Sequence, residues 1–214
     1  MISLLLHITI YIGFTPFIIL IFKGSFHKNY NYIIPLLCLT AVASFYEGVL
    51  EDFTTFQLHT KYWFLIYNFF EFFCIYLFFK KLIERTSNLY FLSFLIIFLS
   101  IFFLTITIEG FENGLLLNTI VTLPTTLFVL ISSILWFKQQ FEENITDHFL
   151  FSNPNFFIVI GLFFYQSSTF ILFLLSDYIF KVNLNLQSFW IINILASLIL
   201  RLLLIIGTWK LKKV

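Results

Sequence analysis

The sequence has little charge for its length. Asp, Glu, Lys and Arg together make up 11% of the 214 residues, whereas apolar residues make up 60%, and the mean hydropathy is +0.99. A water-soluble domain usually has about a quarter of its residues charged. This chain therefore has too little polar surface to cover a globule in water, and its composition predicts a membrane protein.

Several motifs that carry chemistry are also missing. The seven glycines are dispersed and form no phosphate-binding loop, and the four histidines lie in different segments without metal-ligand spacing. Cys38 and Cys74 are single residues inside different apolar segments, which indicates packed thiols rather than a disulfide. We therefore predict no enzyme activity, no catalytic residue, no metal and no cofactor. The net charge of +1 argues against direct binding of nucleic acid.

Apolar segments occupy most of the chain, and each is long enough to cross a bilayer as a helix of about 20 residues. The seven segments are Ile2–Phe22, Tyr32–Leu50, Tyr62–Ile83, Leu89–Ile108, Leu115–Phe137, Phe156–Ser176 and Ser188–Thr208. Charged or turn-forming residues separate them, and no connection is long enough for a soluble domain. The sequence predicts an all-α, polytopic membrane protein, with residues 1–214 forming a single domain of seven transmembrane helices.

Basic residues are unevenly distributed between the two predicted sides. If the N-terminus is outside, nine lysines and arginines fall on the inner side, and only Lys61 and Lys181 fall on the outer side. Membrane proteins concentrate Lys and Arg on the cytoplasmic side. The 33 phenylalanines, with abundant Ile, Leu and Asn, indicate an AT-rich bacterial genome. We therefore predict an N-out, C-in, multi-pass protein of the bacterial cytoplasmic (inner) membrane, whose first segment is retained as a span.

Polar residues inside the apolar segments are the candidates for function, because each is costly in lipid unless it faces the bundle interior or water. They recur at three- and four-residue steps, which places them on one face of each helix. The candidates are His7 in the first segment, Glu47 in the second, Asn68 and Glu71 in the third, Gln166 in the sixth, and Asn193 and Arg201 in the seventh. The fourth segment has few polar residues, so we expect it to face lipid most.

Depth along the helices suggests one ion pair. With a rise of about 1.5 Å per residue, Glu71 lies about 15 Å and Arg201 about 20 Å below the outer starts of their helices. We therefore predict a buried Glu71–Arg201 ion pair, braced by Asn68, Gln166 and Ser197, because a buried charge needs a partner. Stabilisation between helices is the leading interpretation of this pair, and a pathway for an ion, proton or ligand is the alternative.

A second polar cluster is predicted nearer the outer side. His7, Glu47 and Asn193 fall within about one helical turn of each other in depth. A single histidine near an interface is more often a hydrogen-bonded structural residue than a proton switch. Aromatic residues near segment ends, including Trp63, are interpreted as the interfacial aromatic belt.

Three stretches resemble a loose group of small seven-span membrane proteins of Bacteroidetes. These stretches are WFLIYNFFEFFCIYLFF (63–79), FFIVIGLFFYQSSTFILFLL (156–175) and FWIINILASLILRLLLIIGTWK (189–210). The most specific part is the Tyr-Asn-x-x-Glu-Phe core, formed here by Tyr67, Asn68, Glu71 and Phe72. In size, composition and number of spans, the chain also resembles the membrane accessory proteins of type VI-B CRISPR loci.

Three classes of function are open at this point. The first is a non-enzymatic regulatory or accessory protein that acts on a protein partner at the cytoplasmic face, in signalling or in modulation of a defence system. The second is a small transporter or pore that uses the intramembrane polar residues. The third is an intramembrane enzyme with Glu47 or Glu71 as its acid or base. The first is favoured because no complete catalytic set is present.

Overall fold

The fold consists of long helices connected by short segments. The computed structural model describes residues 2–23, 30–52, 57–109, 114–142, 151–181 and 186–211, and within these ranges all regular structure is helical. The helices are α1 (Ile2–Phe22), α2 (Ile34–Asp52), α3 (Gln57–Leu82), α4 (Asn88–Glu109), α5 (Gly114–Glu142), α7 (Pro154–Lys181) and α8 (Leu186–Lys210). Seven helices are thus described, and the all-α prediction is confirmed.

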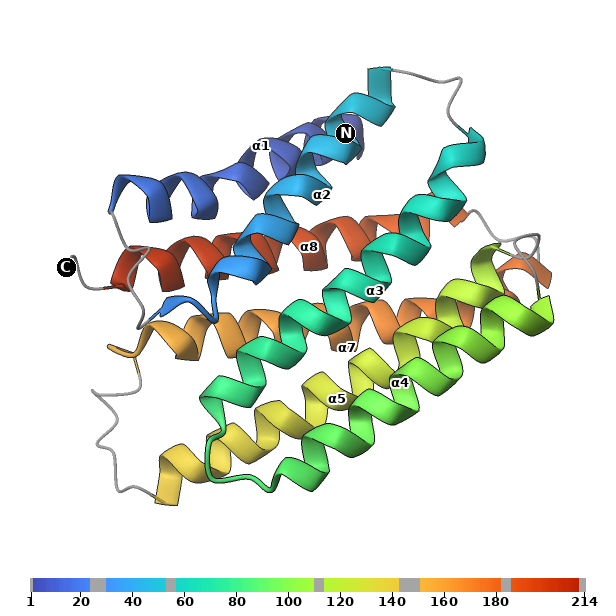
Figure 1. Ribbon diagram of the computed structural model, residues 1–214. Helices are drawn as coiled ribbons and strands as arrows, with labels where there is room; N and C mark the ends of the chain where they lie inside the picture. The colour runs from blue at the N-terminus through green and yellow to red at the C-terminus, as the bar shows by residue number, and fades with distance from the viewer. Residues whose placement is uncertain are drawn as a thin grey trace.

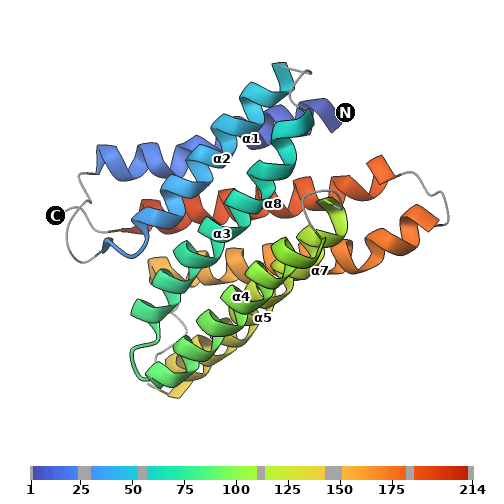
Figure 2. The same cartoon turned by 45° about the vertical axis from the view of Figure 1, so that its right-hand side comes forward.

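The helices form an up-and-down bundle (Figure 1). Helix α8 packs on α7 and α1, α1 also packs on α2, and α5 packs on α3, α4 and α7. Helices α7 and α8 lie side by side in both ribbon views (Figures 1 and 2). Successive helices run in opposite directions, so α1, α3, α5 and α8 all end at the same end of the bundle.

Within the described residues, five helices contain a segment long and apolar enough to cross a membrane. The segments are Leu4–Phe22, Asn88–Thr107, Ile120–Glu142, Pro154–Leu172 and Ile191–Lys210. Helix α2 contributes a shorter apolar stretch, Ile34–Gly48, and α3 carries Glu71, Lys80 and Lys81 in its described part. Of the five segments, that of α4 has the smallest buried share, which agrees with the prediction that this helix faces lipid most.

The bundle has polar side chains inside and apolar side chains outside. On α3, Asn68 and Glu71 are each 7% exposed, whereas Ile66, Phe70 and Leu77 are about half exposed. A soluble helix would show the opposite pattern, with its polar face in water. This arrangement suits a hydrocarbon environment, where polar groups must be satisfied within the protein.

Aromatic residues hold α3, α4 and α5 together. The rings of Phe72 on α3 and Phe98 on α4 are stacked, with centroids 3.9 Å apart and planes 5° apart. Phe128 on α5 is fully buried and its ring lies 5.8 Å from that of Phe72 and 5.3 Å from that of Phe94. Tight aromatic packing of this kind replaces the hydrophobic driving force that is missing between helices in lipid.

Several helices extend beyond the predicted apolar segments, and α3, for example, begins at Gln57 rather than at Tyr62. Helix α5 continues to Glu142 and α7 continues to Lys181, although the sequence predicted connections from Lys138 and from Asp177. Charged residues are good or tolerated helix formers where water is available, so a helix need not end where its apolar segment ends. The start of α7 follows the usual local rule, because Pro154 occupies the first turn and the Asn153 Oδ1 accepts a hydrogen bond from the Asn155 amide at 3.0 Å.

Candidate functional site

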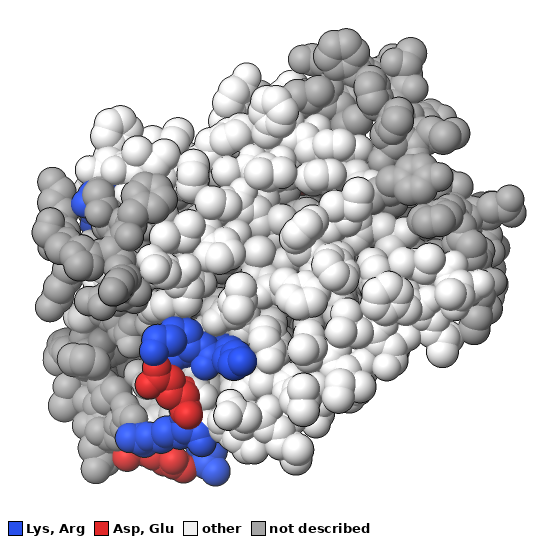
Figure 3. Space-filling view, in the orientation of Figure 1, with Lys and Arg blue, Asp and Glu red and all other residues white. Residues whose placement is uncertain are grey.

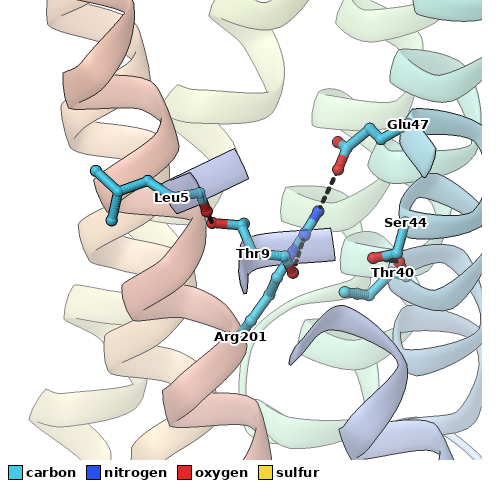
Figure 4. A network of polar contacts seen from close by, with 6 residues as sticks. All are labelled: Leu5, Thr9, Thr40, Ser44, Glu47 and Arg201. Atoms are coloured by element: carbon cyan, nitrogen blue, oxygen red, sulfur yellow. Dashed lines mark hydrogen bonds and ion pairs between the residues drawn. The ribbon is translucent and has the colours of Figure 1, made fainter. Parts of the chain in front are cut away.

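Arg201 is the centre of a polar contact between three helices. It lies in the middle of α8, its side chain is 4% exposed, and its guanidinium reaches between α1 and α2 (Figure 4). One terminal nitrogen donates to the Glu47 carboxylate on α2 at 2.8 Å, and the other donates to the Thr9 carbonyl oxygen on α1. Glu47 is less buried, with 42% of its side chain exposed. The ion pair therefore joins the buried guanidinium of Arg201 to the partly exposed carboxylate of Glu47.

A glycine on α1 makes room for this guanidinium. A Cβ atom at Gly13 would lie 1.9 Å from the Ser44 Oγ and 3.2 Å from the Arg201 Cζ. The first distance is too short for a real Cβ contact and the second is tighter than most, so a side chain at this position would displace the Ser44 hydroxyl and crowd the Arg201 guanidinium. The sequence alone does not reveal this role of Gly13, because a glycine inside an apolar segment gives no sign of which neighbour approaches it.

The predicted ion pair between Glu71 and Arg201 is wrong. Arg201 pairs with Glu47, whereas the Glu71 carboxylate accepts a hydrogen bond from the Gln166 Nε2 at 3.1 Å. The Gln166 Oε1 in turn accepts a hydrogen bond from the Thr126 Oγ1 at 3.0 Å. The prediction used depth alone, which does not fix the direction that each side chain takes around its helix. Gln166 does contact Glu71 as predicted, although it replaces the arginine as the partner.

A cavity of about 120 Å³ connects these two polar contacts. Glu47 on α2, Glu71 on α3, Thr122 on α5, Gln166 on α7 and Arg201 on α8 all line it. Among the described residues, the lining includes two carboxylates and one guanidinium, together with several amide and hydroxyl groups. A polar cavity of this size holds several waters or one small solute. We refer to it below as the central cavity.

The remaining predicted residues divide between the central cavity and the outer surface. Asn68, Asn193 and Ser197 line the cavity, and the buried Asn193 Oδ1 has no hydrogen-bond partner within the described structure. His7 does not line it and lies exposed on α1. The predicted cluster of His7, Glu47 and Asn193 is therefore wrong for the histidine, while the other two residues share the cavity wall. Depth along the helix does not fix which way a side chain such as that of His7 points around the helix axis.

Aromatic side chains form another part of the wall. Trp63, Tyr67 and Tyr165 line the central cavity, and the Trp63 ring stacks on Tyr46 with centroids 3.8 Å apart. Trp63 therefore lies in the cavity wall, although its place near a segment end predicts a residue of the interfacial belt. The four-residue steps from Trp63 to Tyr67 to Glu71 put these three side chains on one helix face, so this spacing could have revealed the shared position.

Metal binding has no support among the residues that the structure describes. They contain no group of three His, Cys, Asp or Glu side chains able to hold a metal ion, and Cys38 and Cys74 are both free. Whether the chain lacks a metal, a cofactor or catalytic residues altogether stays a prediction.

The fold and the cavity define a bundle of long apolar helices with a polar site at its centre. No protein-family model, curated protein or solved structure matches the chain. The resemblance to seven-span proteins of Bacteroidetes and to CRISPR accessory proteins therefore stays a prediction.

Proposed function

We propose that all seven helices cross the bacterial cytoplasmic membrane, including α2 and α3. Support comes from the distribution of polar side chains on these two helices. The carboxylates of Glu47 and Glu71 have partners inside the bundle, and the apolar side chains of Phe45 and Phe70 are exposed. A helix whose charges are paired inside the protein can present an entirely apolar face to lipid.

The proposed orientation is N-out and C-in. Within the described ranges, Lys61 near the start of α3 and Lys181 at the end of α7 belong to one end of the bundle. The other six lysines and arginines, apart from Arg201, lie near the ends of α1, α3, α5 and α8 or in the turn after α3, at the opposite end. They are Lys23, Lys80, Lys81, Arg85, Lys138 and Lys210. Several of them gather at the lower left of the space-filling view (Figure 3). The positive-inside rule then assigns this end to the cytoplasm. Lys28, Lys212 and Lys213 lie outside the described residues, as do the side chains of Lys61 and Lys181.

For the activity, we propose a non-enzymatic regulatory or accessory protein whose central cavity binds a small polar solute. The observation that carries this proposal is the central cavity itself, which is lined by residues from five helices and contains the Glu47–Arg201 pair. Arg201 ties α8 to both α1 and α2, so a solute that changes its contacts would change how these helices pack. The bilayer surrounds the bundle, and the basic end is the surface for a protein partner, in a bacterial signalling or defence system.

Solute binding is testable with the purified protein in detergent micelles. We expect at least one of ethylammonium chloride, sodium acetate, acetamide and ethanol to raise the thermal unfolding midpoint, because ligands that bind only the folded state stabilise it. Ser197→Leu fills the central cavity and should abolish the rise. Ser100→Leu makes the same change on the exposed face of α4 and should preserve it. No rise with any of the four solutes would contradict the proposal.

A small transporter is the second candidate. The 42% exposure of the Glu47 side chain favours it, because a carboxylate at the cavity wall that is also accessible gives a solute a way in. Proteoliposomes separate the two functions. A transporter accumulates the labelled solute inside the vesicle, whereas a regulatory protein binds it without uptake.

A further inference from the structure

The charges that the described residues contribute to the wall of the central cavity do not balance. The described lining contains the carboxylates of Glu47 and Glu71 and the single guanidinium of Arg201. The Arg201 guanidinium forms an ion pair with the Glu47 carboxylate at 2.8 Å and donates a hydrogen bond to the Thr9 carbonyl oxygen. Glu71 accepts its hydrogen bond from a neutral amide, and no described lysine or arginine forms an ion pair with it. With Glu71 ionised, the described part of the wall therefore carries one carboxylate more than its cations compensate.

Burial makes this imbalance costly. Glu71 is 7% exposed, and an ionised carboxylate withdrawn from water loses several kcal/mol of solvation unless a positive charge or several donors replace the water. The amide of Gln166 supplies one donor. A cation inside the central cavity would restore the balance of charge beside Glu71.

Aromatic rings in the same wall suit a particular kind of cation. Trp63, Tyr67 and Tyr165 all line the central cavity. The faces of such rings attract ammonium groups, most strongly when water is excluded. Stacking of Trp63 on Tyr46, with planes 17° apart, holds the indole in place before any ligand arrives. Asn193 adds a buried oxygen that lacks a hydrogen-bond partner in the described structure, and this oxygen can accept from an ammonium N–H.

The volume limits the size of the ligand. A cavity of about 150 Å³ accommodates benzene, so the 120 Å³ of the central cavity admits a ligand of about five non-hydrogen atoms or fewer. Ammonium, methylammonium, ethylammonium and ethanolamine are within this limit. Long-chain amines and nucleotides exceed it.

We propose that the central cavity binds a small primary ammonium ion, whose charge is paired with the Glu71 carboxylate and whose carbon atoms contact the rings of Trp63, Tyr67 and Tyr165. This assignment rests on the proposed solute-binding function and names the class of solute. The ligand enters as a cation and leaves unchanged, so binding involves no bond formation.

Calorimetric titration of the full-length protein in lipid nanodiscs tests the assignment. Ethylammonium chloride is compared with ethanol, which has the same number of non-hydrogen atoms and no charge, and with sodium chloride at equal ionic strength. We expect ethylammonium to bind and ethanol and sodium to bind at least about tenfold more weakly, because a desolvated ion pair is lost. This comparison uses the wild-type chain and does not depend on the folding of any variant.

Two variants locate the binding. Glu71→Gln keeps the shape of the side chain and should weaken ethylammonium binding by at least about tenfold. Glu84→Gln changes an exposed carboxylate that pairs with Lys81 at the far end of α3 and should leave the affinity unchanged. Glu71→Gln with undiminished affinity would overturn the assignment.

The remaining outcomes separate this inference from the proposed function. Ethanol, acetate or acetamide binding as tightly as ethylammonium would overturn the cation assignment and leave solute binding intact. If sodium bound as tightly as ethylammonium, the site would be one for an inorganic cation, and the ammonium assignment would also be overturned. Absence of binding by every solute would overturn both proposals.

Discussion

At the scale of single residues, the structure depends on where each buried charge finds its partner. Arg201 combines an ion pair to Glu47 with a hydrogen bond to a backbone carbonyl of α1. Glu71 lies in the same cavity wall and is held by Gln166. In this account, the Glu47 carboxylate stabilises the bundle through Arg201, and the Glu71 carboxylate is available to pair with a ligand.

A double-mutant cycle tests the Glu47–Arg201 pair. Glu47→Gln and Arg201→Gln should each lower the free energy of unfolding by about 1–3 kcal/mol, less than for a fully buried pair because Glu47 is 42% exposed. The double variant should lose less than the sum, with a coupling of about 1 kcal/mol or more. Unfolding in mixed detergent and SDS micelles measures these values.

The exposed pair of Lys81 and Glu84 is the matched control for this cycle. Its two side chains are 63% and 65% exposed, so its coupling should be below about 0.5 kcal/mol. A Glu47–Arg201 coupling no larger than that of this control would show that the buried pair contributes nothing specific.

At the scale of helices, the close approach of α1 to α2 and α8 positions the site. Gly13 permits this approach, since a Cβ atom there would overlap the Ser44 Oγ and crowd the guanidinium of Arg201. Small residues at helix crossings have this role in membrane bundles, because they let backbones come close.

Substitution of Gly13 tests this account of the crossing. Gly13→Ala should lower the free energy of unfolding by about 1–3 kcal/mol, the usual cost of overpacking, and Ser44→Ala should recover part of the loss. Gly48→Ala is the control on α2, because its Cβ would meet Ile10 at an ordinary distance of 3.4 Å. This control should be neutral or stabilising, since alanine favours the helix over glycine. A Gly13→Ala variant as stable as Gly48→Ala would contradict the account.

The sequence predicted the helices better than their contacts. Long apolar segments identified all seven helices, because length and composition are local properties. The depth of each residue along its helix predicted that Glu71, Gln166 and Arg201 lie close together, and all three line the central cavity. Depth alone does not predict which of these side chains form an ion pair or a hydrogen bond. Pairing depends on rotation around each helix axis and on neighbours such as Gly13, and both are set by tertiary packing.

At the scale of the whole molecule, the bundle has two different ends. The basic end carries five of the described lysines and Arg85, and Lys23 there donates to the Leu211 carbonyl at 2.9 Å, which joins the end of α1 to that of α8. A cation at the C-terminal end of a helix satisfies carbonyls that have no helical partner. The central cavity lies between the two ends, because Trp63 and Asn193 are in the first halves of α3 and α8, whereas Glu71 and Arg201 are in their second halves.

Cysteine labelling in intact cells tests the proposed orientation. In a background of Cys38→Ala and Cys74→Ala, we expect Glu84→Cys in the turn after α3 to react with a membrane-impermeant thiol reagent only after permeabilisation. Glu109→Cys at the end of α4 should react without permeabilisation. Labelling of Glu84→Cys in intact cells, with Glu109→Cys protected, would reverse the orientation.

The central claim is that the cavity admits a small cation from water into an apolar bundle. Its most direct test is the reactivity of Ser197→Cys in the same cysteine-free background, with methanethiosulfonate reagents that carry either an ethylammonium or an ethylsulfonate group. Ser197 lines the cavity, whereas Leu202, the control position, is 43% exposed on the outer face of α8.

We predict that Ser197→Cys reacts with the ethylammonium reagent faster than with the sulfonate reagent, because Glu71 attracts the cation and repels the anion. Free ethylammonium should slow this reaction, and Leu202→Cys should react with neither reagent because lipid covers it. A Ser197→Cys variant as unreactive as Leu202→Cys, or one that prefers the sulfonate reagent, would contradict the claim.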